Sequence, residues 1–241
     1  MRFLDISYAM PSKNLALDEA LLETAASGKC CATLRLWESP VPFVVVGSSQ
    51  RVEEVVDLEN CQSYAMPVLR RCSAGGAVLQ GPGCLNYALA LSYDAVPEVS
   101  SLHASYEYIL GKVSDALATL HVSTVREGVS DLAVQGMKCS GNSQRRKKNA
   151  CLHHGTLLYD MNADDMEDYL IEPEDRPAYR GTRNHAAFVQ PLGFHVEQLR
   201  AALIRAFCPG APAVQPFPDE EEAMLLLARN KYSQAEWTFR R

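Results

Sequence analysis

Apolar residues recur along the chain with two different spacings, and each spacing predicts one kind of secondary structure. The helical spacing, with apolar side chains gathered on one face, predicts helices over 14–26, 102–120, 196–207 and 220–232. Ser12 or Asn14 is expected to cap the first helix, because both side chains accept hydrogen bonds from backbone N–H groups.

Alternating or continuous apolar runs predict strands over 33–39, 42–50, 66–71, 75–80, 85–93, 131–138 and 155–161. The segment 131–138 is broken by a Gln-Gly turn, and the polar segment 139–154 is expected to be a loop. Strands gathered between helices favour an α+β fold, a mixed sheet flanked by helices, over a regular βαβ alternation. With 241 residues, 47% of them hydrophobic, we expect a single domain over 1–241.

Charge and cysteine content narrow the class of protein. A net charge of -6 argues against a nucleic-acid-binding protein, which needs a basic face. The sequence has no apolar run long enough for a membrane span and no signal-like start, so we expect a cytoplasmic protein. The eight cysteines lack zinc-site spacing, which suits reduced thiols rather than a metal centre.

The sequence lacks the GxxxxGK[ST], GxGxxG, HExxH and GxSxG motifs, and three polar clusters remain as candidate chemistry. The first is RRCSAGGAVLQGPGCLNYAL, from Arg70 to Leu89. Gly75 and Gly76 leave backbone N–H groups open to an anion such as a phosphate or carboxylate. Successive strand residues point to opposite faces, so only one of Arg70 and Arg71 is expected to reach such a site.

The second cluster is DLAVQGMKCSGNSQRRKK. Asp131 and Lys138 stand seven residues apart across the turn, so their side chains can face one cavity. An ammonium there can neutralise charge on a transferring phosphate or polarise a carbonyl group. The charge run 145–148 is expected to be a solvated loop.

The third cluster is ACLHHGTLLYD, in which Cys151 precedes His154 by three residues. A histidine that lowers the pKa of a nearby thiol makes a nucleophile for acyl transfer. A small buried cysteine at the start of a strand is the alternative, and the sequence leaves both open.

Seven segments in this order resemble one family: NLALDEALL, LRLWESP, VVVGSSQ, RRCSAGGAVLQGPGCLNYAL, DLAVQGMKCSGNSQRR, HHGTLLYDM and KYSQAEW. The chain is similar to the lipoate-protein ligase A family of the biotin/lipoate ligase superfamily. The resemblance implies a class II synthetase-like, biotin protein ligase-like core. It also implies activation of lipoate by ATP and Mg2+ to lipoyl-AMP, followed by transfer to a lysine on a carrier domain. That carrier would be the E2 subunit of a 2-oxoacid dehydrogenase or a glycine cleavage H protein.

The resemblance also implies roles for individual residues. Lys138 would be catalytic, contacting the acyl carbonyl and the α-phosphate. The acyl chain and adenylate would be lined by Arg70, Ser73, Gly75, Gly76, Ala77, Val78, Asn86, Asp131, Ser140, Gly141, His154, Gly155 and Thr156. Asp131 would in addition bind Mg2+.

The sequence departs from the family pattern in ways that keep other functions open. Ala74 stands where the family has glycine, Gln80 stands where it has histidine, and no C-terminal accessory domain is expected, so a separate partner chain could supply it. Cys151 and Lys138 resemble the cysteine and lysine of octanoyltransferases. An octanoyl or lipoyl transferase acting through a Cys151 thioester is therefore an alternative, although the ligase-like transferases carry their cysteine before the strand that Asp131 opens. A non-catalytic carrier-binding subunit is a third hypothesis.

Overall fold

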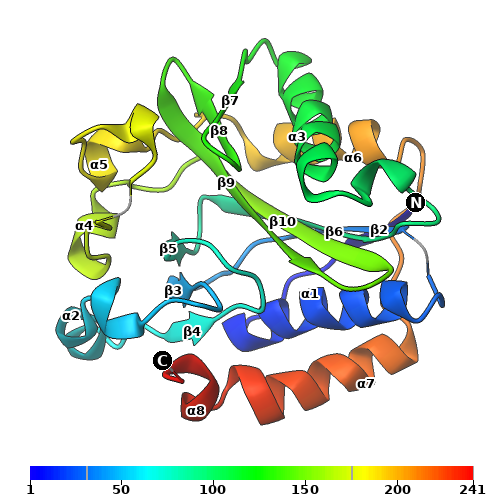
Figure 1. The fold of residues 1–241 in the computed structure, drawn as a ribbon, viewed down its shortest axis with the longest axis horizontal. Coiled ribbons are helices and arrows are strands. Elements are labelled where there is room, and N and C mark those ends of the chain that lie inside the picture. The colour runs from blue at the N-terminus through cyan, green and yellow to red at the C-terminus, as the bar shows by residue number, and fades with distance from the viewer. Residues whose placement is uncertain (31, 175, 241) are drawn as a thin grey trace.

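Two β-sheets with helices on both sides form the architecture (Figure 1), described by a computed structural model for residues 1–30, 32–174 and 176–240. The strands are β1 (Arg2–Asp5), β2 (Ala32–Trp37), β3 (Phe43–Val46), β4 (Val68–Arg70), β5 (Val78–Gln80), β6 (Cys84–Ser92), β7 (Val125–Glu127), β8 (Asp131–Val134), β9 (Met137–Arg146) and β10 (Ala150–Leu158). Cys31 lies outside the described residues.

The α-helices are α1 (Pro11–Ala26), α2 (Leu58–Ser63), α3 (Leu102–Ala118), α4 (Asp165–Tyr169), α5 (His185–Phe188), α6 (Val196–Phe207), α7 (Pro218–Leu227) and α8 (Ala235–Thr238). Short 3-10 turns lie at Val52–Glu54, Pro97–Val99 and Ala178–Arg180, and a π-helical turn, Ala228–Tyr232, joins α7 to the segment before α8. Among the described residues, no helix combines the length and the apolarity needed to cross a lipid bilayer.

The larger sheet has seven strands in the order β1-β2-β6-β10-β9-β8-β7, and the smaller has the order β4-β3-β5. Each sheet contains one parallel pair, β1 with β2 and β3 with β4, while its other pairs are antiparallel. The predicted α+β class with a mixed sheet is therefore confirmed, with the strands divided between two sheets.

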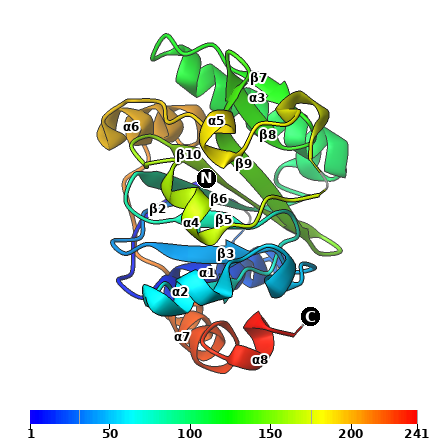
Figure 2. The same ribbon diagram turned by 90° about the vertical axis from the view of Figure 1, so that its left-hand side faces the viewer.

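Each face of the larger sheet has its own helical layer. Helices α3 and α6 pack on one face, and α1 and α7 lie beyond the other, as Figures 1 and 2 both show. Side chains of β10 alternate between the layers: Cys151 joins the cluster under α3, whereas Leu152 joins the cluster against α1. The two faces of one strand therefore have different surroundings.

Helix α1 begins three residues before the predicted start. Pro11 occupies its first turn, where the missing N–H costs no hydrogen bond, and Met10 precedes it without a side-chain cap. Ser12 and Asn14 are thus inside the helix, and neither is its cap. The Asn14 side chain instead accepts a hydrogen bond from the Tyr8 N–H.

The segment 139–154 is not a loop, because most of it belongs to the paired strands β9 and β10. The polar side chains of β9 misled the prediction, since they find partners inside the fold. Gln144 bonds with Ser105 of α3, and Asn142 accepts a hydrogen bond from the hydroxyl group of Tyr87. A strand whose polar side chains are satisfied in this way needs no apolar alternation.

Candidate active site

The candidate active site is a cavity of about 180 Å³ between α1, the loop that follows β4, and strands β6, β9 and β10. We call residues 71–77 the glycine loop. Predicted site residues on the cavity wall are Gly75, Gly76, Ala77, Val78, Asn86, Asp131, Lys138, Gly141, His154, Gly155 and Thr156. A groove of about 1510 Å³ shares the glycine loop, Asp131 and Lys138 with this cavity, so the two spaces adjoin.

Lys138 and Asp131 form an ion pair at the boundary of these two spaces. The Lys138 Nζ lies 2.8 Å from Asp131 Oδ1, and the Tyr179 hydroxyl donates to Asp131 Oδ2 over 2.8 Å. Gly141 leaves room for the lysine, since a Cβ atom there would approach Lys138 Cε to 3.1 Å. The ammonium is held in place yet reachable, because its side chain remains 25% exposed.

Arg71 supplies a second cation to the cavity. Its Nε donates to Ser73 Oγ over 3.1 Å and its Nη2 to the Ala74 carbonyl over 2.7 Å. Its Nη1 is buried and has no hydrogen-bond partner among the described residues. Burial lowers the pKa of Arg71 to about 10, which leaves the group charged at neutral pH. A buried, charged donor without a partner on a cavity wall suits a carboxylate or phosphate oxygen.

Arg70 does not reach the cavity, which corrects its predicted role in binding the acyl adenylate. It is fully buried on the other side of β4, where it donates to the carbonyl groups of Gly47, Gln50, Trp237 and Thr238. Only one of the two arginines reaches the site, as expected, but it is Arg71, the residue directly after β4, rather than Arg70.

A chain of polar side chains links the glycine loop to α1. Ser73 Oγ lies 2.5 Å from His154 Nε2, and His154 Nδ1 lies 3.6 Å from Asp18 Oδ2. Asp18 is paired with the buried Arg35 at 2.6 Å. The order Ser-His-Asp matches that of a hydrolase triad, yet Ser73 is 1% exposed and is not among the residues that line the cavity. This chain supports the loop rather than supplying a nucleophile.

One wall of the cavity is a closed ring of three polar side chains. Gln80 Nε2 donates to Thr156 Oγ1 over 2.7 Å, Thr156 Oγ1 donates to Asn86 Oδ1 over 2.7 Å, and Asn86 Nδ2 donates to Gln80 Oε1 over 2.9 Å. Gln80, which departs from the family pattern, is a member of this ring. It contributes to the shape of the wall through Asn86 and Thr156.

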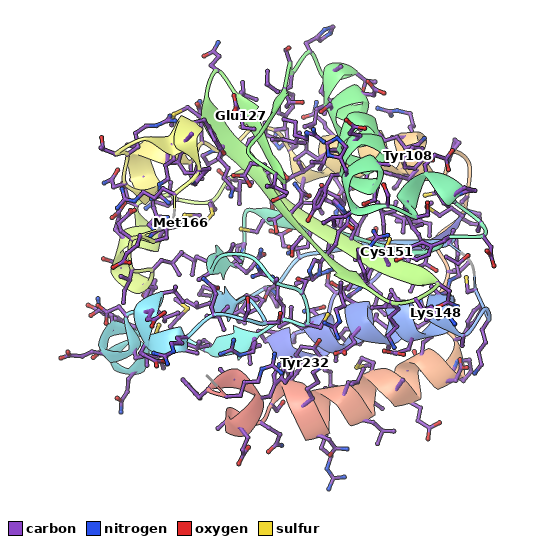
Figure 3. All side chains as sticks on the ribbon, viewed as in Figure 1. Tyr108, Glu127, Lys148, Cys151, Met166 and Tyr232 are labelled. Carbon is purple, nitrogen blue, oxygen red and sulfur yellow. The ribbon has the colours of Figure 1, made fainter. Side chains whose placement is uncertain are left out.

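Ser140 and Cys151 face away from the cavity, and both predicted roles are corrected. Ser140 is fully buried beside Asn142 on the α3 side of the sheet. Cys151 is 0% exposed in the apolar cluster under α3, where Figure 3 labels it on β10, and burial raises the pKa of its thiol to about 11. A thiol that is protonated, covered and on the wrong face of the sheet is not placed to attack a substrate.

None of the cysteines among the described residues lines the cavity or the groove. The same residues also offer no group of three or more His, Cys, Asp or Glu side chains able to hold a metal ion. Both carboxylate oxygens of Asp131 are engaged, one by Lys138 and one by Tyr179. Mg2+ is usually bound through one or two carboxylates together with substrate phosphates, so Mg2+ at Asp131 stays a prediction.

Sequence reasoning missed Asp18, Arg35 and Tyr179, and it named Arg71 only as one of two candidates. A signal for the first pair was available, since Arg35 interrupts an apolar strand and Asp18 falls within the helix whose other buried residues are mostly apolar. A buried charge requires a partner, and two such charges in neighbouring elements indicate a pair. Tyr179 gave no comparable signal.

Comparisons with known proteins agree on the family, although the relatives are named for two different activities. A family model described as the lipoyl protein ligase A/B catalytic domain matches residues 10–208. The octanoyltransferase LipM of Anoxybacillus flavithermus is 27% identical over 100% of this chain and 98% of its own length, and LipM of Bacillus subtilis is 26% identical with the same coverage.

Solved structures show the same fold. A lipoate-protein ligase A bound with ATP is 23% identical, with a TM-score of 0.86 over 99% of this chain and 98% of its own. A bi-partite lipoate protein ligase from Thermoplasma acidophilum, described with its E2 lipoyl domain, is 23% identical, with a TM-score of 0.85 over 99% of this chain and 95% of its own.

Proposed function

The chain belongs to the lipoyl protein ligase A/B catalytic domain family, and we propose that it joins a lipoyl or octanoyl group to the lysine ε-amine of a carrier protein domain. The cavity supports this proposal because its wall combines apolar and charged side chains. Leu15, Trp37 and Val45 line it together with Arg71 and Lys138. Such a space suits a chain-like acid whose carboxyl carbon is the reacting centre.

The proposed carrier is a lipoyl domain. It gains support from the Thermoplasma acidophilum relative, which is described with its E2 lipoyl domain. The adjoining groove of about 1510 Å³ offers room for a protein loop or a nucleotide beside Lys138.

In the proposed chemistry, the carrier amine attacks the acyl carbonyl carbon and forms an amide bond. The bond from that carbon to its leaving group breaks, and the departing group is AMP from an acyl adenylate or a thiol from a thioester. The amine loses a proton to solvent or to the leaving group. Lys138 would stabilise the negative charge that develops on the carbonyl oxygen, and Arg71 would hold an oxygen of the acyl donor.

We propose activation by ATP as the route that supplies this acyl group. The observation that carries the proposal is the lack of a cavity-lining thiol among the described residues, because an acyl adenylate needs no enzyme nucleophile. The ATP-bound relative of the same fold agrees with this route. In this scheme Lys138 would also neutralise charge at the α-phosphate while the carboxylate attacks phosphorus and pyrophosphate leaves.

An ATP-independent octanoyl or lipoyl transferase is the second candidate function. It is favoured by the relatives that are 26–27% identical over nearly their full length and are named octanoyltransferase LipM. Cys151 is not placed to form the thioester, so this route would need direct transfer from the donor to the carrier amine.

The two routes differ in what they consume. The protein is incubated with an apo lipoyl domain and either lipoate plus ATP or octanoyl-acyl carrier protein without ATP, and the intact mass of the lipoyl domain is measured. Modification only with lipoate plus ATP supports the ligase. Modification only with the thioester supports the transferase, and no modification in either arm overturns the proposed function. Lys138→Ala protein serves as the negative control.

A further inference from the structure

The segment KYSQAEW, residues 231–237, lies outside the cavity, yet its contacts lead to Arg71. Lys231 Nζ lies 2.7 Å from both carboxylate oxygens of Glu19 on α1, and the Tyr232 hydroxyl donates to Glu19 over 2.6 Å. Figure 3 labels Tyr232 between α1 and the C-terminal helices. The Lys231 ammonium also sits 4.1 Å from the centre of the Trp237 ring. These contacts fix Trp237 relative to α1.

Trp237 and Arg70 bond to each other in both directions. The Trp237 indole N–H donates to the Arg70 carbonyl over 2.8 Å, and Arg70 Nε donates to the carbonyl groups of Trp237 and Thr238 over 3.1 Å and 2.8 Å. Arg70 is fully buried, and a buried guanidinium is costly unless acceptors surround it. The position of Arg70 is therefore tied to the position of α8.

The hydrogen bonds between Arg70 and α8 matter because of the place of β4 in its sheet. Strand β4 is three residues long and is an edge strand, since it pairs with β3 alone in the order β4-β3-β5. A short edge strand has few ladder hydrogen bonds to fix its direction. The indole N–H of Trp237 bonds to β4 at Arg70, its last residue, immediately before the glycine loop begins.

A second contact reaches the glycine loop from the same segment. Arg240 Nη2 donates to the Ser48 carbonyl over 2.7 Å, and the Ser48 N–H donates to the Ser73 carbonyl over 2.8 Å. Ser73 in turn accepts the hydrogen bond from Arg71 Nε. The C-terminal segment thus contacts both the strand before the loop and the backbone that supports the loop.

We propose that Trp237 is a positioning residue for acyl-donor binding: by holding Arg70 on the outer side of β4, it directs Arg71 into the cavity. Arg71 directly follows the last residue of β4, and its side chain leaves the backbone on the side opposite to that of Arg70. A rotation of the chain there that released Arg70 would therefore turn Arg71 away from the cavity. This inference rests on the proposed function, because it takes the cavity to be the site of the acyl donor.

The test compares two substitutions that each remove one aromatic donor from a backbone carbonyl. Trp237→Phe removes the indole hydrogen bond to the Arg70 carbonyl and leaves the backbone carbonyl of residue 237 in place as an acceptor for Arg70. Tyr93→Phe removes the hydrogen bond from Tyr93 to the Lys147 carbonyl near the β9–β10 turn. Loss of one such hydrogen bond changes the equilibrium that it supports, here binding of the acid, by about fivefold. We expect Trp237→Phe to raise the Kd for lipoate or octanoate, measured calorimetrically, and the corresponding KM by about five- to tenfold. Its kcat should stay within about twofold, and Tyr93→Phe should change none of these values.

A double-mutant cycle separates positioning from general destabilisation. With Arg71→Ala already present, Trp237→Phe should weaken acid binding no further, because the group it positions is gone. Additive effects in this cycle, or equal effects of Trp237→Phe and Tyr93→Phe, overturn the inference. Because acid binding is measured without turnover, failure of the positioning role can be told apart from failure of the proposed function. A wild-type protein that binds neither acid and modifies no carrier contradicts the proposed function itself.

Discussion

Lys138 and Asp131 lie on neighbouring strands of one hairpin, and the Lys138 ammonium meets the Asp131 carboxylate at 2.8 Å where the cavity joins the groove. The turn between them contains Gln135 and Gly136, both with positive φ angles, which suits the tight connection. The hairpin therefore brings a cation to the boundary of the two spaces, where the proposed acyl transfer would develop negative charge.

Replacing Lys138 by alanine should slow the chemical step strongly and leave binding of the acid nearly unchanged. One preorganised charged donor contributes about 100- to 1000-fold to a rate of this kind, so kcat should fall by that factor. The Kd for the acid should change by less than about threefold, because Arg71 remains. Carrier modification followed by mass spectrometry measures the rate. Lys148→Ala, at an exposed position of the β9–β10 turn, should retain full activity. Equal losses in both variants would contradict the role of Lys138.

Replacing Cys151 by alanine should leave carrier modification nearly unchanged. The thiol is buried in the cluster under α3 on the far face of the sheet, so it does not contact the cavity. Burial raises its pKa to about 11, and in the native protein it should not react with a maleimide at pH 7.5, whereas the partly exposed Cys30 should. A Cys151→Ala protein that folds but transfers no acyl group would restore the thioester mechanism.

Removing the Asp18 carboxylate should destabilise the protein strongly. Arg35 is fully buried and pairs with Asp18 at 2.6 Å, so Asp18→Ala leaves a buried guanidinium without its counter-charge. The expected loss in the free energy of unfolding is about 3–5 kcal/mol. Urea unfolding measures it. Asp5→Ala, which breaks the more exposed pair with Arg200, should cost less than about 1 kcal/mol. Similar costs for the two variants would show that the Asp18–Arg35 pair is not a stabilising contact.

Acid should weaken the fold through His153. This side chain is fully buried against Tyr87 and Tyr106, and burial, followed by the nearby His154, lowers its pKa from 6.5 to about 3. Below pH 6.5 the unfolded chain binds a proton at His153 that the folded chain does not bind. The free energy of unfolding therefore falls as pH drops from 6.5 toward 3. At pH 4.5 the loss from this group should be about 3 kcal/mol.

The control for this pH dependence is a histidine of the same chain whose side chain is exposed to solvent. His153→Gln should remove that part of the difference in unfolding free energy between pH 7.5 and pH 4.5, whereas His103→Gln should not, because His103 is largely exposed on α3. If His153→Gln keeps the full wild-type pH dependence, titration of His153 is not its source.

The fold was predictable from the sequence where apolar spacing was strong. Helices over 102–120 and 196–207 correspond to α3 and α6, and the strand over 85–93 corresponds to β6. The polar half of β9 was not predictable by the same rule, because its side chains are satisfied by partners distant in sequence, such as Tyr87 and Ser105. Local spacing contains no information about such partners.

The cavity was predictable in part. The seven-residue spacing of Asp131 and Lys138 across a turn indicates a shared cavity, and both residues line it. The choice between Arg70 and Arg71 was not predictable, since it depends on how β4 pairs with β3 and on contacts with residues 237 and 238. Those contacts join segments that no local pattern connects.

The hydrogen bonds between Arg70 and Trp237 span 167 positions of the chain. To form contacts of such long range, a large loop must close, which costs entropy before the contacts stabilise anything. During synthesis, the part of the chain up to β10 can pair its strands. The contacts that hold Arg70, beside Arg71, form only after residues 237 and 238 have left the ribosome. A nascent chain would thus acquire its sheets before the direction of the Arg71 side chain is fixed.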